Sequence, residues 1–543
     1  MESARPLRIP TGSQSLAGPG GPRYTGSSDG KELLKALMVC TGQSAANQAF
    51  IFFQAFIFFQ ALKFFTAASN SLSMKPEPGL GQDMLEVHNP ADGSLVGHVH
   101  AGTEDDVNDA VRTSWEAFSS WSDTDPLDRS RILFSAARLV REDKKELSLL
   151  LTREQGKPLR ESVNEIAGFA RVLEYYASIT GTLQGDYGYS KNYGHMMVMR
   201  QPLGVCAAII PWNMPALIMG WKTGPVLAAG NTMVLKPSAT APLTCIALAE
   251  HLYRAGLPRQ VLRLVTGSGR VVGQALARHN DIRSLSFTGA VSTGTGVAEI
   301  AGPTLKKLIL ELGGSDAMIV CKDADPYAAA KGAVSGRFFN CGQTCTSIKR
   351  VFVDSSVYEP FVQKVRELTE ALSIGNGLSD GVDMGPVHTS GQRKDVHFLV
   401  QETVNNDQGK VLSGGYIPDN GLLKDGSFYP PTIMTRVDPD APVMKEEVFG
   451  PVLPVSAFDT VADAIDMANA TRFGLGASIW THDMRTISQA TRELDAGIVW
   501  VNQHLRIPPE VPFGGVKSSG LGRENGRYAL LQYLEEKTIL INP

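Results

Sequence analysis

The sequence predicts an α/β fold in which parallel sheets are covered by helices on both faces. Short β-rich runs alternate along the chain with stretches of helical periodicity, and such alternation is typical of parallel sheets with crossover helices. With 543 residues the chain exceeds the size at which one hydrophobic core keeps growing, so two or more sub-domains are expected. Its 43% of hydrophobic and 20% of charged residues are ordinary for a globular protein.

Residues 1–81 differ in composition from the rest of the chain. Ser, Gly and Pro are frequent near the start, and the hexamer QAFIFF occurs twice between Gln48 and Phe59. Because this apolar stretch is shorter than the roughly 20 residues that span a bilayer, we expect no stable membrane insertion. We expect a low-complexity extension that is disordered or dispensable. A targeting leader, a membrane-associated segment and a gene-model artefact with the true start near Met74 are the alternatives.

From about Leu85 the pattern becomes regular. Thr103 and Asp106 form a capping box, and apolar side chains recur after it at helical spacing, which predicts an amphipathic helix. The predicted strands that follow are Val205–Ile210, Thr232–Leu235, Val261–Val265 and Ser284–Phe287, and the predicted helices include Pro242–Ala255 and Arg270–His279. Ligands of such sheets bind at the carboxyl edge of the strands, so we expect the functional residues in the loops after these strands.

Charge and cysteine content exclude several function classes. The formal net charge of −4 provides no basic field for a polyphosphate backbone, so no nucleic-acid partner is expected. The six cysteines are few for this length and form no CxxC pair, so neither a disulfide framework nor a metal site is predicted. A reducing compartment is favoured: the cytoplasm, with the mitochondrion as the alternative.

One cysteine has the surroundings of a nucleophile. Residues 338–350 read FFNCGQTCTSIKR and place Cys345 in a polar, glycine-containing stretch that ends in two cations. Cations and polar donors lower the pKa of a thiol and make its thiolate available to attack a carbonyl. Cys206 and Cys245 lie in apolar segments and are expected to be inert. Cys341, which would share a helix face with Cys345, is the competing candidate.

Further motifs surround this segment. They are PWNMP (211–215), LKPS (235–238), FTGAVSTG (287–294), ELGGSDA (311–317), EEVFGPV (446–452) and PFGGVKSSGLGRENG (512–526). The segment around Cys345 resembles the active-cysteine signature of the aldehyde dehydrogenase superfamily, and ELGGSDA resembles its glutamate signature. The resemblance extends over roughly residues 85–540.

The resemblance implies the domain organisation of that superfamily. A Rossmann-type, parallel-sheet NAD(P)-binding domain would comprise residues 82–182 and 202–311, and an α/β catalytic domain residues 312–527. Residues 183–201 and 528–543 would form a small β oligomerisation element, in which a hairpin joins a C-terminal strand. Because an exposed strand edge can pair with a second subunit, we expect a homodimer or a homotetramer.

The resemblance also implies the reaction, which is oxidation of an aldehyde to the carboxylic acid with NAD or NADP. Cys345 would form a thiohemiacetal and then a thioester, and Glu311 would activate the water that hydrolyses it. The Asn213 amide and the Cys345 backbone N–H would stabilise the oxyanion, although Asn213 also fits an ordinary turn. Two alternatives remain: a coenzyme A-acylating semialdehyde dehydrogenase, and a non-catalytic binding protein of the same fold.

The cofactor residues implied by the resemblance are spread over several loops. They are Ile210, Pro211, Trp212, Lys236, Ser238, Ala239, Gly269, Phe287, Thr288, Gly289, Ala290, Leu312, Glu447 and Phe449. Lys236 and Ser238 would reach the adenosine ribose, Glu447 would hold the nicotinamide ribose, and Phe449 would pack near the nicotinamide.

Two of these positions depart from the pattern of the superfamily. Ala239 stands where an acid commonly binds the adenosine ribose hydroxyls, and Ala290 stands where a serine is frequent. Both changes remove polar contacts on the adenosine and phosphate side. The choice between NAD and NADP therefore stays open, and so does the choice among semialdehydes and small aliphatic or aromatic aldehydes as substrate.

Overall fold

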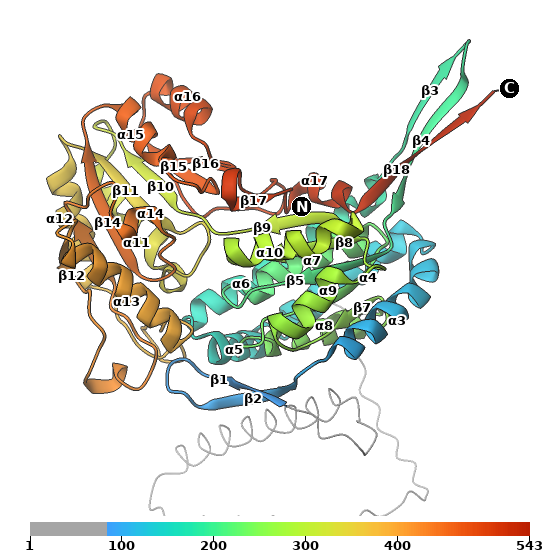
Figure 1. Ribbon diagram of the computed structural model, residues 1–543, viewed down its shortest axis with the longest axis horizontal. Coiled ribbons are helices and arrows are strands. Elements are labelled where there is room, and N and C mark those ends of the chain that lie inside the picture. Colours follow the sequence, from blue (N-terminus) through green and yellow to red (C-terminus); the bar gives the residue numbers. More distant parts are fainter. Residues whose placement is uncertain (1–83, 543) are drawn as a thin grey trace, which may run out of the picture. The chain divides into compact units, whose positions relative to one another are not determined.

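The computed structural model describes residues 84–542, and they fall in one compact unit (Figure 1). The predicted extension at residues 1–81, with its repeated hexamer, lies outside the described residues. Four sheets of two, seven, six and three strands are present, together with their covering helices. The α/β class expected from the sequence is confirmed. No helix within residues 84–542 is long and apolar enough to cross a membrane.

The described chain begins with a hairpin and four helices. Strands β1 (Met84–His88) and β2 (Leu95–His100) pair antiparallel, and α3 (Glu104–Ser122), α4 (Pro126–Glu142), α5 (Lys144–Gln155) and α6 (Leu159–Ile179) follow. The predicted capping box starts α3: the Thr103 hydroxyl accepts the Asp106 N–H at 3.3 Å, and the Thr103 N–H donates to the Asp106 carboxylate at 2.7 Å. Two of the helix's first unpaired N–H groups are thereby satisfied.

The six-stranded sheet contains all four predicted strands. Its order is β17-β9-β8-β5-β6-β7, and its strands are β5 (Val205–Ile209), β6 (Thr232–Lys236), β7 (Leu262–Leu264), β8 (Ser284–Thr288), β9 (Lys307–Glu311) and β17 (Gly520–Leu521). Five strands run parallel, and β17 pairs antiparallel with β9. Every residue of β5 and β6 is buried, as expected for strands covered on both faces.

Helices cover this sheet on both sides because successive strand residues face opposite ways. Cys206 and Ala208 pack in a core with α4, α6, α7 (Pro215–Ala228) and α8 (Leu243–Arg254). Val205 and Ala207 face a second core with α3, α9 (Gln274–Arg278) and α10 (Val291–Ala301). The predicted helical stretch Arg270–His279 is helical as far as Arg278, and its first turn, η2 (Gly269–Gly273), is π-helical before α9 begins.

The seven-stranded sheet forms the second half of the unit. Its order is β12-β13-β14-β11-β10-β15-β16, with β10 (Asp316–Val320), β11 (Ile348–Asp354), β12 (Lys410–Ser413), β13 (Thr432–Thr435), β14 (Val452–Phe458), β15 (Gly476–Trp480) and β16 (Ile498–Val501). One face packs against α11 (Pro326–Phe338) and α12 (Tyr358–Glu370). The other packs against α13 (Ser390–Asn405), α14 (Pro442–Lys445), α15 (Val461–Asn469) and α16 (Met484–Glu493).

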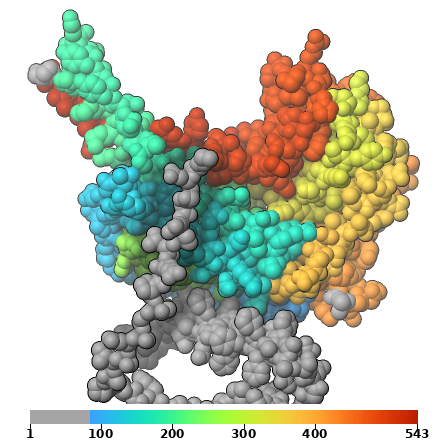
Figure 2. All heavy atoms as spheres, turned by 180° about the vertical axis from the view of Figure 1, so that it is seen from behind, coloured from blue at the N-terminus to red at the C-terminus, as the bar shows by residue number. Residues whose placement is uncertain are grey.

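A three-stranded antiparallel sheet carries the C-terminus. Strands β3 (Asp186–Ser190) and β4 (Gly194–Pro202) form the predicted hairpin, and β18 (Leu534–Ile541), which follows the short helix α17 (Gly526–Gln532), pairs with residues 195–202 of β4. In Figures 1 and 2 this sheet forms an arm that projects away from the helices of the unit. The short 3-10 turns η1 (Thr180–Thr182), η3 (Gly302–Thr304), η4 (Phe339–Gly342), η5 (Gly421–Leu423) and η6 (Lys517–Ser519) complete the described chain.

Candidate active site

The loop between α11 and β11 carries the candidate nucleophile. Its backbone turns through three successive left-handed residues, Asn340 (φ 50°), Cys341 (φ 57°) and Gly342 (φ 73°). A Cβ on Gly342 would lie 2.3 Å from the Gly450 carbonyl oxygen, so only glycine fits this close approach. Because of this turn, Cys341 and Cys345 do not share a helix face. The Cys341 side chain is buried, whereas that of Cys345 is partly exposed, which favours Cys345 as the reactive thiol.

Of the two cations of this segment, only Lys349 lowers the pKa of the thiol as expected, and other effects outweigh it in the described state. Burial, followed by the charge of Glu311, raises the pKa of Cys345 to about 12, and Lys349 opposes this only in part. Arg350 is directed elsewhere, since its guanidinium donates to the carbonyl oxygens of Ser315 at 2.7 Å and Ala468 at 2.9 Å. The thiol is therefore protonated in this state.

Glu311 is the last residue of β9 and is only 2% exposed. Its carboxylate lies against the backbone at Gly514, where a Cβ would approach Oε1 to 2.9 Å. Burial and the neighbouring charge of Glu524 raise the pKa of Glu311 above that of an ordinary carboxyl group. A raised pKa suits a general base that works near neutral pH.

A buried ion pair lies beside Glu311. The Lys222 ammonium donates to the Glu524 carboxylate at 2.5 Å and to the Ser286 hydroxyl at 2.7 Å, and both charged side chains are at most 1% exposed. The charges of both influence Glu311. Neither Lys222 nor Glu524 was singled out in the sequence, although a lysine within the apolar stretch 215–228 was a signal.

The ELGG turn brings Glu311 and Cys345 to the same place. A Cβ on Gly314, three residues after Glu311, would lie 2.6 Å from the Cys345 carbonyl oxygen. The Gly314 N–H donates to Glu447 Oε1 at 3.0 Å. Candidate base, candidate nucleophile and a candidate cofactor carboxylate are thus held around one turn.

Asn213 lies between β5 and α7, is 5% exposed, and reaches the nucleophile loop. Its side-chain amide donates to the Gln343 carbonyl oxygen at 3.0 Å, two residues before Cys345. In return, the Asn340 amide donates to the Asn213 carbonyl oxygen at 2.9 Å. The structure therefore joins all three predicted catalytic positions, Asn213, Glu311 and Cys345, through one loop.

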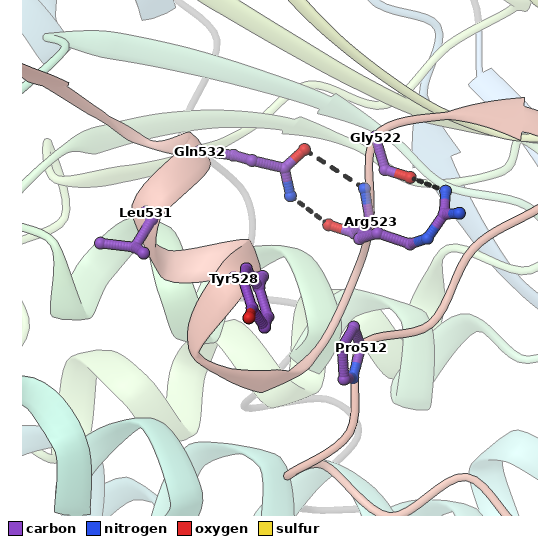
Figure 3. Close-up of a pocket in the computed structure, with 6 residues that line it drawn as sticks. All are labelled: Pro512, Gly522, Arg523, Tyr528, Leu531 and Gln532. Carbon is purple, nitrogen blue, oxygen red and sulfur yellow. Dashed lines mark hydrogen bonds between the residues drawn. The ribbon is translucent and has the colours of Figure 1, made fainter. Parts of the chain in front are cut away.

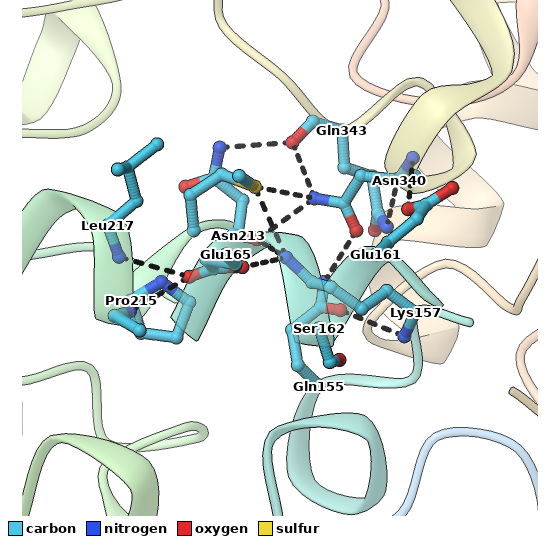
Figure 4. A network of polar contacts seen from close by, with 12 residues as sticks. Gln155, Lys157, Glu161, Ser162, Glu165, Asn213, Pro215, Leu217, Asn340 and Gln343 are labelled. Carbon is cyan, nitrogen blue, oxygen red and sulfur yellow. Dashed lines mark hydrogen bonds and ion pairs between the residues drawn. The ribbon is translucent and has the colours of Figure 1, made fainter. Parts of the chain in front are cut away.

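A buried network behind Asn213 was not foreseen from the sequence (Figure 4). The Lys157 ammonium donates to the Asn213 carbonyl oxygen at 2.7 Å and pairs with Glu165 at 2.5 Å. Glu165 also accepts the Ala216 N–H at 2.9 Å, at the start of α7, and Glu161 accepts the Asn340 N–H at 2.9 Å. Two acids four residues apart among the apolar residues of the segment that forms α6 were the available signal, because buried acids are rare unless they are paired.

The cofactor candidates of the six-stranded sheet lie at its carboxyl edge. The register sets Ile209 beside Lys236 and Phe287, and Thr288 beside Glu311. Ile210, Pro211 and Trp212 follow β5, Ser238 and Ala239 follow β6, and Gly289 and Ala290 follow β8. A Cβ on Gly273, in the turn that Gly269 opens, would lie 3.9 Å from the Lys236 side chain. All these positions therefore border one edge.

The start of α10 and the buried Lys236 both suit a dinucleotide at this edge. Ala290 starts α10 without any side-chain cap, which leaves helix N–H groups available to phosphate oxygens. Leu312 packs closely over Gly294 of this helix, where a Cβ would approach it to 2.3 Å. Lys236 is buried, which lowers its pKa to about 8, and donates to the Pro237 carbonyl oxygen at 2.9 Å.

The nicotinamide-side candidates lie near the nucleophile loop. The Trp212 ring stacks on His388 with centroids 4.5 Å apart and meets Phe449 edge-on at 5.6 Å. Glu447 Oε1 lies 3.4 Å from the Lys349 ammonium. His388 and Lys349 were not singled out as cofactor or catalytic candidates in the sequence.

Within residues 84–542, no group of three or more His, Cys, Asp or Glu residues could hold a metal ion.

A cavity of about 520 Å³ lies outside this arrangement (Figure 3). It is lined by Pro512, Gly522, Arg523, Tyr528, Leu531 and Gln532. None of the predicted site residues lines it. Arg523 donates to the carbonyl oxygens of Gly515 at 2.9 Å and Gly522 at 2.7 Å, so this guanidinium supports the glycine turn beside Glu311.

Comparison with known proteins gives a consistent result. A family model described as "Aldehyde dehydrogenase family" matches residues 78–539. The chain is 39% identical over 458 residues to the mitochondrial succinate-semialdehyde dehydrogenase of Arabidopsis thaliana, covering 84% of this chain and 86% of that protein. It is 38% identical over 467 residues to betaine aldehyde dehydrogenase 2 of Rhizobium meliloti, covering 85% and 95%.

Solved structures agree with this result. An NADP-dependent enzyme of E. coli matches with a TM-score of 0.83 and 38% identity, covering 85% of this chain and 95% of that one. Betaine aldehyde dehydrogenase of Staphylococcus aureus in complex with NAD+ matches with a TM-score of 0.83 and 32% identity, covering 85% and 92%.

Proposed function

Because the chain belongs to the aldehyde dehydrogenase family, whose members oxidise aldehydes with NAD or NADP, we propose that Cys345 attacks the aldehyde and that Glu311 releases the acid. The observation that carries this proposal is the close approach of the ELGG turn to the nucleophile loop, where a Cβ on Gly314 would lie 2.6 Å from the Cys345 carbonyl oxygen. Base and nucleophile are held by one backbone contact.

In the first step, the Cys345 sulfur bonds to the aldehyde carbon and the carbonyl oxygen becomes an oxyanion. The thiol proton leaves to solvent, which the partly exposed side chain can reach. The Asn213 amide carries two N–H groups, so one can stay on the Gln343 carbonyl oxygen while the other donates to the oxyanion. The Cys345 backbone N–H is the second donor. Donors fixed before the reaction stabilise the oxyanion more than the aldehyde.

When bound, the nicotinamide would supply the acceptor for the hydride that leaves the thiohemiacetal carbon. The residues at the carboxyl edge fit such a cofactor. The uncapped start of α10 at Ala290 would meet the pyrophosphate, Lys236 and Ser238 would meet the adenosine ribose, and Glu447 the nicotinamide ribose. We assign residues 82–182 and 202–311 to cofactor binding and residues 312–527 to catalysis on the same basis.

In the second step, water hydrolyses the thioester. Glu311 takes one proton from the water, and the water oxygen bonds to the acyl carbon. The carbon–sulfur bond then breaks, which returns the thiolate and releases the acid. The raised pKa of Glu311 suits this proton transfer, since a stronger base takes the proton more readily. Burial is the main cause of this raised pKa; in the adjacent ion pair, Glu524 raises it further and Lys222 lowers it.

For the substrate, we propose a class of aldehydes. Relatives are named for succinate semialdehyde, betaine aldehyde and phenylacetaldehyde, which are anionic, cationic and neutral. Cys345 packs against the large apolar core of the six-stranded sheet, as do Met214, Leu217 and Ile507, and the Trp221 and Phe513 rings in that core are 5.1 Å apart. An apolar wall of this kind favours aliphatic or aromatic aldehydes over strongly hydrated ones.

An aldehyde panel tests the proposed function directly. The purified protein is given NAD or NADP with semialdehydes and with aliphatic and aromatic aldehydes, and NAD(P)H absorbance is followed while mass spectrometry identifies the product. We expect the free acid with and without coenzyme A, and no turnover in Cys345→Ser, because a hydroxyl is a far weaker nucleophile than a thiolate. An acyl-coenzyme A product would replace hydrolysis with acyl transfer, and an active Cys345→Ser variant would disprove the assignment of the nucleophile.

The assembly and the compartment follow from the same proposal. We assign a homodimer or a homotetramer, formed through the sheet of β3, β4 and β18. The five cysteines within the described residues are free, which suits a reducing compartment. We place the protein in the cytoplasm, with the mitochondrion as the alternative.

A further inference from the structure

Lys349 is a buried cation with three polar contacts, all of them around the nucleophile. It lies in β11, four residues after Cys345, and its side chain is 1% exposed. The ammonium donates to the Thr344 carbonyl oxygen at 2.9 Å and to the Cys345 carbonyl oxygen at 2.6 Å, and Glu447 Oε1 lies 3.4 Å away. Two of the three N–H groups of the ammonium thus donate to the carbonyl oxygens on either side of the Thr344–Cys345 bond, and Glu447 adds an ion pair.

The contact with Thr344 fixes the direction of a particular N–H group. The Thr344 carbonyl and the Cys345 N–H belong to one planar trans peptide, so they point in opposite directions. A donor that holds the carbonyl oxygen therefore sets where the Cys345 N–H points. A charged donor also polarises the peptide, which makes its N–H a stronger donor in turn. The bond to the Cys345 carbonyl oxygen fixes the next peptide, so both peptides beside the nucleophile are held.

The charges around Lys349 are arranged to keep it ionised. Burial lowers the pKa of Lys349, and Glu447 and Asp316 oppose that effect, while Arg337 acts with burial. The charges that raise the pKa of Cys345 are those of Glu311, Asp316 and Glu447, and the charge of Lys349 lowers it. Loss of the ammonium would leave these acids without their shared counter-charge.

We propose that Lys349 is a positioning residue for the oxyanion step: it holds and polarises the Thr344–Cys345 peptide so that the Cys345 N–H faces the acyl oxygen, and it ties Glu447 to the same loop. This inference rests on the proposed function, because it requires an oxyanion at Cys345. No proton leaves Lys349 during the reaction. Both the attack on the aldehyde and the hydrolysis of the thioester pass through an oxyanion, so loss of Lys349 slows both steps.

The test compares Lys349→Met with Lys349→Arg and with Lys306→Met as a matched control. Lys306 is also a buried lysine, 8% exposed, and donates to the His279 carbonyl oxygen at 2.7 Å, but it precedes β9 at the end opposite Glu311. Three rates are measured: the NAD(P)H burst, steady-state turnover, and alkylation of Cys345 by iodoacetamide between about pH 6 and pH 10. Alkylation needs the thiolate but forms no oxyanion, so it separates the two effects.

In Lys349→Met we expect the burst and turnover to fall about 10- to 100-fold, less than the roughly 10²- to 10³-fold that follows outright loss of a donor. Alkylation should fall by at most about tenfold, as for a rise of about one unit in the pKa of the thiol, and in every case several-fold less than the burst. KM for the cofactor should rise because Glu447 loses its ion pair with Lys349 and keeps only the Gly314 N–H. Lys349→Arg should recover most of the burst, and Lys306→Met should leave all three rates unchanged.

Two results would overturn the inference: a burst in Lys349→Met within about threefold of the unmodified enzyme, or a burst that falls only in proportion to alkylation. The second would mean that the cation acts on the thiol alone. Should Lys349→Met not fold, Lys349→Gln, which keeps a donor without the charge, is judged by the same ratio of rates. If the unmodified protein oxidises no aldehyde, the proposed function fails. If the unmodified protein and Lys349→Met are equally active, only the role of Lys349 is rejected.

Discussion

At the scale of single residues, the two halves of the reaction meet in a buried setting that disfavours charge on both partners. Burial raises the pKa of Cys345 to about 12 and raises that of Glu311 as well. Cys345 therefore keeps its proton in the described state, and Glu311 releases its proton at a higher pH than an ordinary carboxyl group does. The two cations near Cys345 in the sequence suggested a lowered pKa for the thiol. In the described state, however, Lys349 and Arg350 donate to backbone carbonyl oxygens and not to the sulfur.

The first prediction concerns Glu311→Gln. Hydride transfer precedes hydrolysis, so the variant should still give a burst of about one NAD(P)H per active site, and steady-state turnover should fall by about 10²- to 10⁴-fold. Rapid-mixing absorbance measures both. If the burst disappears together with turnover, Glu311 acts before the thioester forms.

The same residue sets a pH dependence. The pKa of Glu311 is raised, and hydrolysis needs its carboxylate, so deacylation should be lost as the pH falls through that raised pKa. The loss should begin at a higher pH than the value of about 4.3 for an unperturbed glutamate. Single-turnover deacylation followed against pH measures this limb, and a rate that stays constant down to about pH 5 would contradict it.

Ala239 carries the prediction on cofactor choice. An acid beside the adenosine ribose accepts hydrogen bonds from both hydroxyls and repels the 2′-phosphate of NADP. With alanine there and Lys236 nearby, we expect kcat/KM values for NAD and NADP within about thirtyfold of each other, and Ala239→Glu should shift the ratio toward NAD. A preference for NAD of about a thousandfold or more in the unmodified enzyme would mean that another residue decides.

At the scale of elements, the strands could be predicted from the sequence better than the site. Fully buried runs such as β5 and β6 are continuous in sequence, and the capping box of α3 is local. The helix at Arg270–His279 was less successful, because its first turn is π-helical. Lys157 and Asn213 are 56 residues apart. No local pattern reports a contact of that kind.

The network on α6 gives a prediction on stability. Burial raises the pKa of Glu161 to about 7, above its unfolded value, so its contribution to stability is present at low pH and is lost as the pH rises from about 4.5 to 7. Glutamine keeps an oxygen for the Asn340 N–H and carries no charge. Glu161→Gln should therefore raise the free energy of unfolding by up to about 3 kcal/mol at pH 8 and by much less at pH 5. Denaturant unfolding at the two pH values measures this, and equal effects would contradict it.

At the scale of the whole molecule, β18 is the element through which subunits are expected to meet. It is the last strand of its sheet, paired with β4 on one side only among the described strands, and its Leu540 and Ile541 side chains are 62% and 44% exposed. An edge strand with exposed apolar side chains is a template for pairing with another chain.

Deletion of residues 537–543 should therefore lower the native mass about two- to fourfold, from dimer or tetramer to monomer. Residues 534–536 still pair with β4 in the variant, so the first part of β18 stays in the sheet. Met484→Lys serves as the control, because Met484 is 72% exposed on α16, and this variant should keep the unmodified mass. Sedimentation velocity and circular dichroism separate loss of assembly from loss of fold. A truncated protein that keeps the unmodified mass, or an unmodified protein that is already monomeric, would exclude β18 as the assembly edge.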